Sequence, residues 1–114
     1  MPSRESRNSL PVLPYYILLA LGEGAAHGWE IIRRIRALTD EAANPSSGSL
    51  YLAMTRLEDD GLISERSAPA GEDERRRYYQ LTAIGRAAAR AESQRLARLV
   101  RLARAVDLLQ EPRP

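Results

Sequence analysis

The chain has 114 residues, 44% of them apolar and 28% charged, which is the composition of one ordinary globular domain. It has no cysteine and one histidine, which excludes disulfides, thiolate zinc sites and cysteine nucleophiles and suits a reducing compartment. We find neither an apolar run near the ~20 residues of a membrane span nor a cleavable signal. We therefore expect a cytoplasmic protein with no metal and no other cofactor.

The formal net charge is only +2, but it is unevenly distributed along the chain. All the basic residues are arginine, and the segment from Arg75 to Arg104 holds nine of them against a single acid, Glu92. A basic C-terminal half indicates a polyanionic binding partner. A solvated helix face is the alternative interpretation of the same charge run.

The N-terminal part of the chain predicts a tail followed by two helices. Residues 1–11 are polar and carry proline at positions 2 and 11, which is typical of a flexible tail. Leu13–Leu21 is almost continuously apolar and is followed by glycine, which predicts a buried helix. In His27–Thr39 the apolar residues Ile31, Ile35 and Leu38 recur at helical spacing, so this segment predicts an amphipathic helix with arginines on its outer side.

A third helix, a hairpin and a long final helix follow. Leu50, Met54 and Leu57 repeat at helical spacing, so we expect a helix that begins near Ser46 or Ser47 and ends before Gly61. Residues 62–66 and 75–81 read as two strands around a polar loop. Thr82 is a good N-cap for a helix over residues 83–110, ended by Pro112.

This order predicts a mainly α protein with a small β-hairpin, namely a winged helix-turn-helix plus a long C-terminal dimerisation helix. The expected divisions are a flexible tail over residues 1–11, a DNA-binding domain over residues 12–81 and a dimerisation helix over residues 82–110.

The start of the third helix is the first candidate for DNA contact. A helix N-terminus offers unpaired N–H groups and the positive end of a dipole, and in a recognition helix these first residues meet bases and phosphates. The candidate residues are Ser46, Ser47, Gly48, Ser49 and Tyr51. The alternative is that the serines only cap the helix and Tyr51 packs in the core.

The second candidate is the run Arg75, Arg76 and Arg77 on the expected second strand, where alternate side chains share a face. Arginines at the base of a wing suit phosphate contacts and a narrow minor groove. The neighbouring acids Glu72, Asp73 and Glu74 could pair with them, and an ion-paired or solvated hairpin is the alternative.

The long final helix is the third candidate. Leu96, Leu99, Ala103 and Val106 step by three, four and three residues, which predicts a seam like that of a coiled coil. So long an apolar face is most simply buried against a second copy, which predicts a homodimer, a near-palindromic site and recognition helices about 34 Å apart. The alternative is that the helix packs only on its own domain.

Two ring-bearing residues open the second helix. We expect His27 to cap the helix or to pack, rather than to bind a ligand. We expect Trp29 to lie in the core or in an interface. The alternative for Trp29 is a place in a ligand pocket, where its ring would stack on a planar compound. We find no phosphate loop, nucleophile motif or zinc-protease motif, and consecutive acids such as Glu58, Asp59 and Asp60 diverge around a helix. We therefore expect no catalytic residue and no enzymatic activity.

Three stretches together span about residues 15–89: ILLALGEGAAHGWEIIRRI, SSGSLYLAMTRLEDDGLI and RRRYYQLTAIGRAA. Their combination of HG-aromatic-E, SxGSLY and YYxLTxxGR, in this order, resembles the PadR-like transcriptional regulators of the short subfamily with a single C-terminal dimerisation helix. The resemblance implies a winged-helix dimer that binds an operator, usually represses, and in some members responds to phenolic acids, drugs or other planar aromatics. When the family's DNA-contacting positions are transferred to this sequence, the resemblance implies DNA contact by Ser46, Ser47, Ser49 and Tyr51. It implies the same for the wing residues Arg75, Arg76 and Arg77.

The chain departs from the family pattern at several positions. Ser47 and Leu52 stand where proline is frequent, Trp29 stands where tyrosine is usual, and the basic wing residues are all arginine. The function expected is thus a DNA-binding repressor. The resemblance leaves open whether a small aromatic effector releases it, because other family members respond to no known ligand. The rival is a winged helix that binds a protein or senses a ligand without binding DNA.

Overall fold

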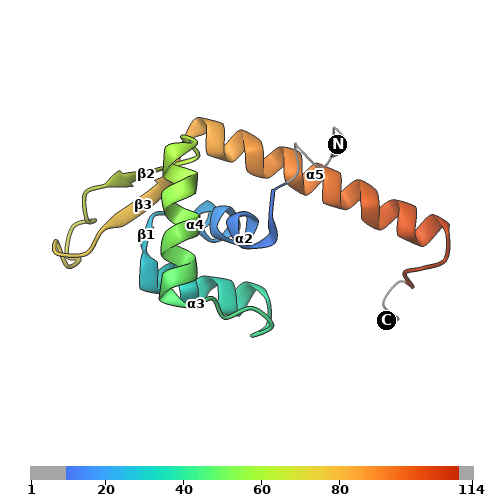
Figure 1. Cartoon of the computed structure of the whole chain (residues 1–114), viewed down its shortest axis with the longest axis horizontal. Coiled ribbons are helices and arrows are strands. Elements are labelled where there is room, and N and C mark those ends of the chain that lie inside the picture. Colours follow the sequence, from blue (N-terminus) through green and yellow to red (C-terminus); the bar gives the residue numbers. More distant parts are fainter. Residues whose placement is uncertain (1–9, 111–114) are drawn as a thin grey trace.

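The computed structural model describes residues 10–110. The elements, in chain order, are α2 (Val12–Gly22), β1 (Ala26–His27), α3 (Gly28–Leu38), α4 (Ser47–Asp59), β2 (Ile63–Arg66), β3 (Tyr78–Leu81) and α5 (Ala83–Ala105). Figure 1 shows α2, α3 and α4 beside a small sheet, with the β2–β3 loop projecting at one end of the molecule and α5 extending toward the other. The predicted fold class, a mainly helical winged helix, is confirmed.

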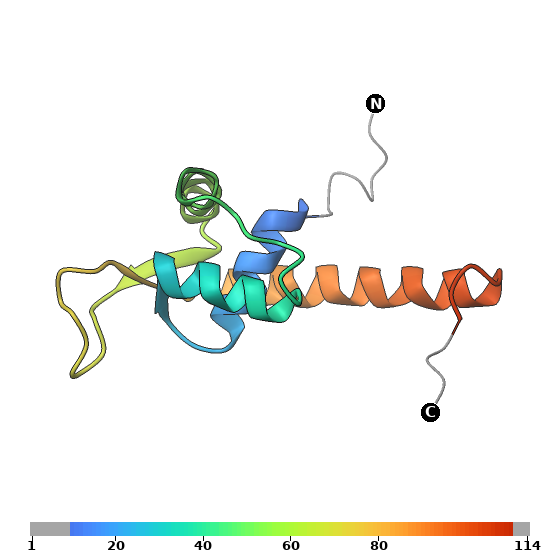
Figure 2. The same cartoon turned by 90° about the horizontal axis from the view of Figure 1, so that it is seen from below.

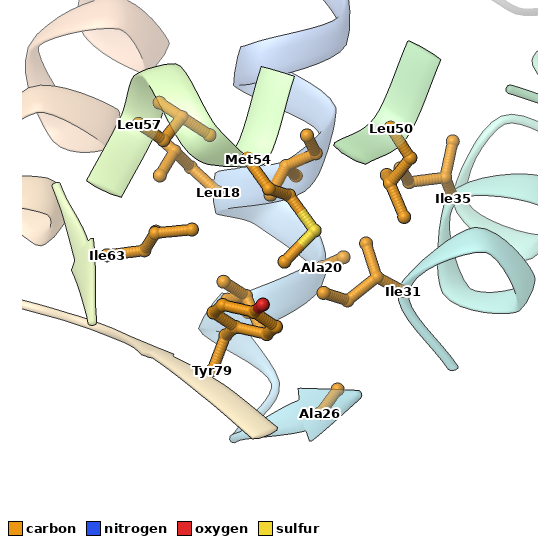
Figure 3. Close-up of a cluster of buried hydrophobic side chains, with 12 residues drawn as sticks. Leu18, Ala20, Ala26, Ile31, Ile35, Leu50, Met54, Leu57, Ile63 and Tyr79 are labelled. Carbon is orange, nitrogen blue, oxygen red and sulfur yellow. The ribbon is translucent and has the colours of Figure 1, made fainter. Parts of the chain in front are cut away.

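The core lies where α2, α3 and α4 meet the sheet (Figure 3). Each helix contributes the residues of its apolar stripe, and the sheet contributes Ile63 and Tyr79. Because the chain has no phenylalanine, aliphatic side chains and Met54 fill this space. The predicted stripes of α3 and α4 are confirmed except at Leu38, which is 47% exposed because it is the last residue of its helix.

The sheet has a strand that the sequence analysis missed. The order is β1-β3-β2, with Ala26 opposite Tyr79 and Ile63 opposite Leu81. A strand of two residues is too short to show any periodicity, and only pairing with a distant segment creates it.

The prediction that the second strand begins at Arg75 was wrong, because β3 begins at Tyr78. The carboxylate of Asp73 accepts a hydrogen bond from the backbone N–H of Arg75 at 2.9 Å, and its carbonyl accepts from the N–H of Arg76 at 3.2 Å. These bonds hold Arg75 and Arg76 in a turn, and Arg77 lies between that turn and the strand, so the alternation of faces expected for a strand does not apply to the three arginines.

The predicted tail and final helix also have different bounds. Residues 1–9 lie outside the described part, but Leu10 packs against the core. At the other end, α5 stops at Ala105, not at Gln110. Asp107 has a φ of 64°, and the N–H of Leu108 returns to the carbonyl of Ala103 at 2.8 Å, a left-handed cap that ends the helix before Pro112 is reached.

The junction between the sheet and α5 is tightly bonded. Thr82 is the N-cap, as predicted: its hydroxyl accepts from the N–H of Gly85 at 3.0 Å and donates to the carbonyl of Gly61 at 2.6 Å. Gly85 is buried against Leu62, and a Cβ added there would lie 1.8 Å from the carbonyl oxygen of Leu62. Only glycine therefore fits at this position.

We expect Gly85→Ala to lower the free energy of unfolding by at least about 2 kcal/mol, because backbone would have to move to relieve the overlap. Gly48→Ala is the matched control: a Cβ there meets nothing within 4 Å, and alanine is the better helix former by up to about 1 kcal/mol. Urea unfolding followed by circular dichroism measures both. Equal stability of the two variants would contradict the packing described.

Candidate nucleic-acid interface

The N-terminus of α4 is an exposed, capped helix tip. Ser46 is the N-cap, and its hydroxyl accepts from the N–H of Ser49 at 3.1 Å and donates to the hydroxyl of Ser49 at 3.0 Å. Ser46, Ser47, Gly48 and Ser49 are all exposed. The predicted helix start is confirmed, and capping leaves most of the tip open to a ligand, with the positive end of the helix dipole behind it.

Tyr51 points outward from the first turns of α4. Its side chain is 61% exposed, whereas Leu50 is 4% exposed in the core. Successive helix residues are rotated by about 100°, so burial of Leu50 turns Tyr51 toward the solvent. The alternative that Tyr51 packs in the core is therefore wrong.

The wing, which we define as residues 63–81, carries its arginines with acids of its own. The side chain of Arg75 is 91% exposed and donates to both carboxylate oxygens of Asp73, at 3.1 and 3.2 Å. The hydrogen bond from Arg75 lowers the pKa of Asp73. Arg77 lies 3.4 Å from Glu65. The expected pairing of the arginines with the acids of residues 72–74 is confirmed for Asp73, whereas Glu65 was not expected as a partner. Exposed ion pairs of this kind are weak, so a phosphate can replace the carboxylate in them.

His27 caps α3, as expected. Its Nδ1 accepts from the N–H of Glu30 at 3.2 Å, and Glu30 completes a capping box. The hydrogen of the neutral ring is therefore on Nε2, which lies 3.1 Å from Oε1 of Glu30. Arg76 brings its Nη1 to 3.1 Å from that same Nε2. A guanidinium N–H facing a ring N–H is not satisfied by it. Nε of the same guanidinium lies 3.8 Å from Oδ2 of Asp73, in a partly exposed ion pair.

Burial lowers the pKa of His27 from its ordinary value, and the charges of Arg76 and Arg33 lower it further, against an opposing effect of Glu30. The neutral ring is also the form that can accept the capping hydrogen bond. The histidine is thus held as a neutral structural residue.

A cavity of about 350 Å³ opens between α3, α4 and β3. We call it the tip–wing cavity. Its mouth includes Ser47 and Tyr51 from the helix tip, Arg76 and Arg77 from the wing, and Trp29 from α3, and its floor is apolar: Ile32, Leu50, Met54 and Tyr79. The structure therefore brings two of the predicted tip residues and two of the predicted wing residues to one surface. In Figures 1 and 2, α4 and the wing lie toward one end of the molecule, away from the C-terminal end of α5.

Trp29 was expected mainly in a core or an interface, but its side chain is 60% exposed at this cavity. The core interpretation is wrong, and the alternative that places Trp29 at a pocket agrees with the geometry. The guanidinium of Arg33 lies 4.4 Å from the centre of the indole. The sequence analysis did not single out Arg33, although its spacing of four residues from Trp29 places the two side by side on a helix.

Arg34 was also misjudged, because the sequence placed it on the outer side of its helix. Its guanidinium instead donates to the carbonyls of Ala20 at 3.0 Å and Gly24 at 2.7 Å, which lie at the C-terminal end of α2. The carbonyl of Ala20 also accepts from the N–H of Glu23 at 3.3 Å, and Gly24 lies just beyond the helix end. A basic side chain from α3 thus bridges carbonyls at the end of α2 and fixes the α2–α3 connection.

The predicted seam of α5 is only partly covered. Leu96 and Ala103 are half-buried, whereas Leu99 is 40% and Val106 64% exposed, and Val106 is the C-cap rather than a helix residue. The C-terminal half of α5 extends beyond the other helices (Figure 2). The alternative that this helix buries its apolar face on its own domain is therefore wrong.

Within residues 10–110, no group of three or more His, Cys, Asp or Glu side chains is placed to hold a metal ion. In the same range, no helix is long and apolar enough to cross a membrane.

The fold and this surface define a winged helix-turn-helix protein of the nucleic-acid-binding kind. The family model for the transcriptional regulator PadR-like family matches residues 17–91, so the chain belongs to that family. No curated protein matches the chain significantly.

Solved structures agree with the assignment. A transcriptional regulator from Clostridium thermocellum is 28% identical with a TM-score of 0.69, over 92% of this chain and 96% of that one. A PadR-like transcription factor from Bacteroides fragilis is 25% identical with a TM-score of 0.69, over 90% and 94% of the two chains. Bacillus subtilis PadR, solved in complex with operator DNA, is 22% identical with a TM-score of 0.60, over 91% of this chain and 51% of that one.

The capping role of His27 predicts a stability that falls in mild acid. The unfolded ring protonates near its ordinary pKa of about 6.5, whereas the folded ring protonates at a lower pH. The unfolded state therefore binds more protons as the pH drops through this window, and stability is lost. We expect the thermal midpoint to fall more between pH 7.5 and 5 for the native chain than for His27→Asn, in which a non-titrating side chain keeps the cap. Parallel curves would show that His27 is not the group responsible.

Proposed function

We propose that this chain is a sequence-specific DNA-binding regulator that acts as a homodimer and represses transcription. The observation that carries the proposal is the tip–wing cavity, around which a serine-rich helix tip and wing arginines face one surface. Bacillus subtilis PadR, which shares the fold, is bound to operator DNA in its solved structure. This supports duplex DNA as the binding partner.

We assign the recognition role to the tip of α4. Its first residues are exposed and would enter the major groove, where Ser49 and Tyr51 would meet base edges. The wing residues Arg75, Arg76 and Arg77 would bind phosphates, which fixes the register of the protein on the duplex. Arg76 and Arg77 are the best placed of the three, because both line the tip–wing cavity.

We assign dimerisation to the exposed seam of α5, Leu96, Leu99, Ala103 and Val106. Two copies joined along this seam would cover the apolar side chains that a single chain leaves in water, and would present two helix tips to a near-palindromic site. The dimer would repress by covering the promoter duplex that it binds.

We assign release to a small planar aromatic effector. The tip–wing cavity has the volume of a small-ligand site, an apolar floor and the indole of Trp29 at its mouth. A compound bound there would occupy the surface assigned to DNA. Loss of duplex binding on addition of one member of a set of aromatic compounds would identify it, and no loss with any member would count against this cavity as the effector site.

The DNA assignment predicts two kinds of variant. Arg76→Gln should weaken binding to the protein's own promoter fragment and to an unrelated duplex alike, and should reduce the slope of log affinity against log salt by about 0.9, the contribution of one phosphate. Ser49→Ala and Tyr51→Ala should weaken promoter binding more than unrelated binding. Fluorescence anisotropy with labelled duplexes measures all of these.

Arg86→Gln on α5 is the control for the loss of one charge, and we expect it to bind as the native chain does. Native binding by all three test variants would contradict the assignment of the site. Failure of the native chain to bind any duplex at about 50 mM salt would favour a winged helix that binds a protein or a ligand instead.

The dimer assignment predicts that Leu99→Glu is monomeric in light scattering at micromolar concentration and binds the promoter fragment at least about tenfold more weakly, because only one recognition helix remains. Arg101→Gln is the control, because it changes the charge of the helix by the same one unit. Residue 101 lies about 200° round the helix from residue 99, so this variant should remain dimeric. A native chain that is itself monomeric at this concentration would refute the proposal.

A further inference from the structure

Trp29 and Arg33 form an exposed pair at the edge of the tip–wing cavity. The guanidinium of Arg33 lies over the indole, 4.4 Å from its centre. Trp29 is 60% and Tyr51 61% exposed, and both line the same cavity, so two large aromatic side chains meet the solvent at one surface.

The position of the pair relates it to the proposed DNA contacts. Trp29 lies at the same mouth as Ser47 and Tyr51 from α4 and as Arg76 and Arg77 from the wing. A nucleic-acid strand that runs from the helix tip to the wing must pass over this mouth. Positive charge is found on both of its sides, from Arg33 on α3 and from the two wing arginines.

We propose that Trp29 and Arg33 are a third DNA-contact element, which seats the sugar-phosphate backbone between the tip of α4 and the wing. The indole N–H is a donor with no acceptor role, which suits a phosphate oxygen, and the ring face suits a deoxyribose. Arg33 supplies a cation for the same phosphate and fixes the ring. This inference rests on the proposed function, since it requires that the chain binds duplex DNA.

Trp29 is the only tryptophan in the chain, so its fluorescence reports on this site alone. We expect its emission to change on saturation with promoter fragment and with an unrelated duplex, because a backbone contact is independent of sequence. Trp29→Ala should weaken binding to both duplexes about tenfold, the loss expected for one hydrogen bond to a charged group. Trp29→Phe keeps a ring for the deoxyribose but no N–H, so it should weaken binding less than Trp29→Ala does.

Arg33→Gln should reduce the slope of log affinity against log salt by about 0.9. Arg36→Gln is the control, because it is the same change on the same helix. It should leave the slope unaltered, since Arg36 pairs with Glu41 at 2.7 Å, away from the cavity. Thermal unfolding should be nearly unchanged in the Trp29 variants, since the side chain is exposed.

Unaltered emission and an unaltered slope, with Arg76→Gln still weakening binding, would overturn this inference alone. Emission that responds to an aromatic compound and never to duplex would also overturn it. Absence of duplex binding by the native chain would end both proposals.

Discussion

One residue, His27, joins the three elements on which the rest of the surface depends. Its backbone pairs with Tyr78 in the sheet, its ring caps α3, and the same ring lies against Arg76 of the wing. The ring also meets the edge of Tyr78 at 5.4 Å between centroids. Because a single buried residue contacts sheet, helix and wing, the start of α3 cannot move relative to the wing without breaking either the cap or the contacts of His27 with Tyr78. The width of the tip–wing cavity, and the position of Trp29 two residues later, follow from that constraint.

A second set of contacts sets the direction of α5. Thr82 bonds to the backbone at the end of α4, Gly85 touches Leu62, and Tyr15 of α2 meets Ser93 of α5 at 2.7 Å. Glu92 is 4% exposed and accepts two hydrogen bonds from Arg95, so its buried charge is paired beside the contact of α2 with α5. The first half of α5 is therefore rigidly attached to the winged helix. In a dimer built on the second half, this attachment would determine the distance between the two helix tips.

The surface assigned to DNA is not a broad positive patch, since the wing brings carboxylates together with its arginines. Asp73 holds Arg75, Glu65 lies beside Arg77, and the chain as a whole has a formal charge of +2. Binding a phosphate would exchange one anion for another at exposed arginines rather than neutralise isolated charges. Such a surface favours selectivity over indiscriminate attraction, because contacts that depend on geometry, at the tip of α4, then contribute a larger share of the binding free energy.

The sequence by itself determined the features that arise within one element. The apolar spacing of Ile31 and Ile35 and of Leu50, Met54 and Leu57 placed two helices and their buried faces, and Ser46 and Thr82 marked helix starts, because period and capping involve residues within one or two turns. Only the tertiary structure decided that Ala26–His27 is a strand and that Trp29 is exposed beside Tyr51. These features depend on contacts between residues far apart in the chain, such as the pairing of His27 with Tyr78. The packing of the elements selects such partners, so no local pattern in the sequence marks them.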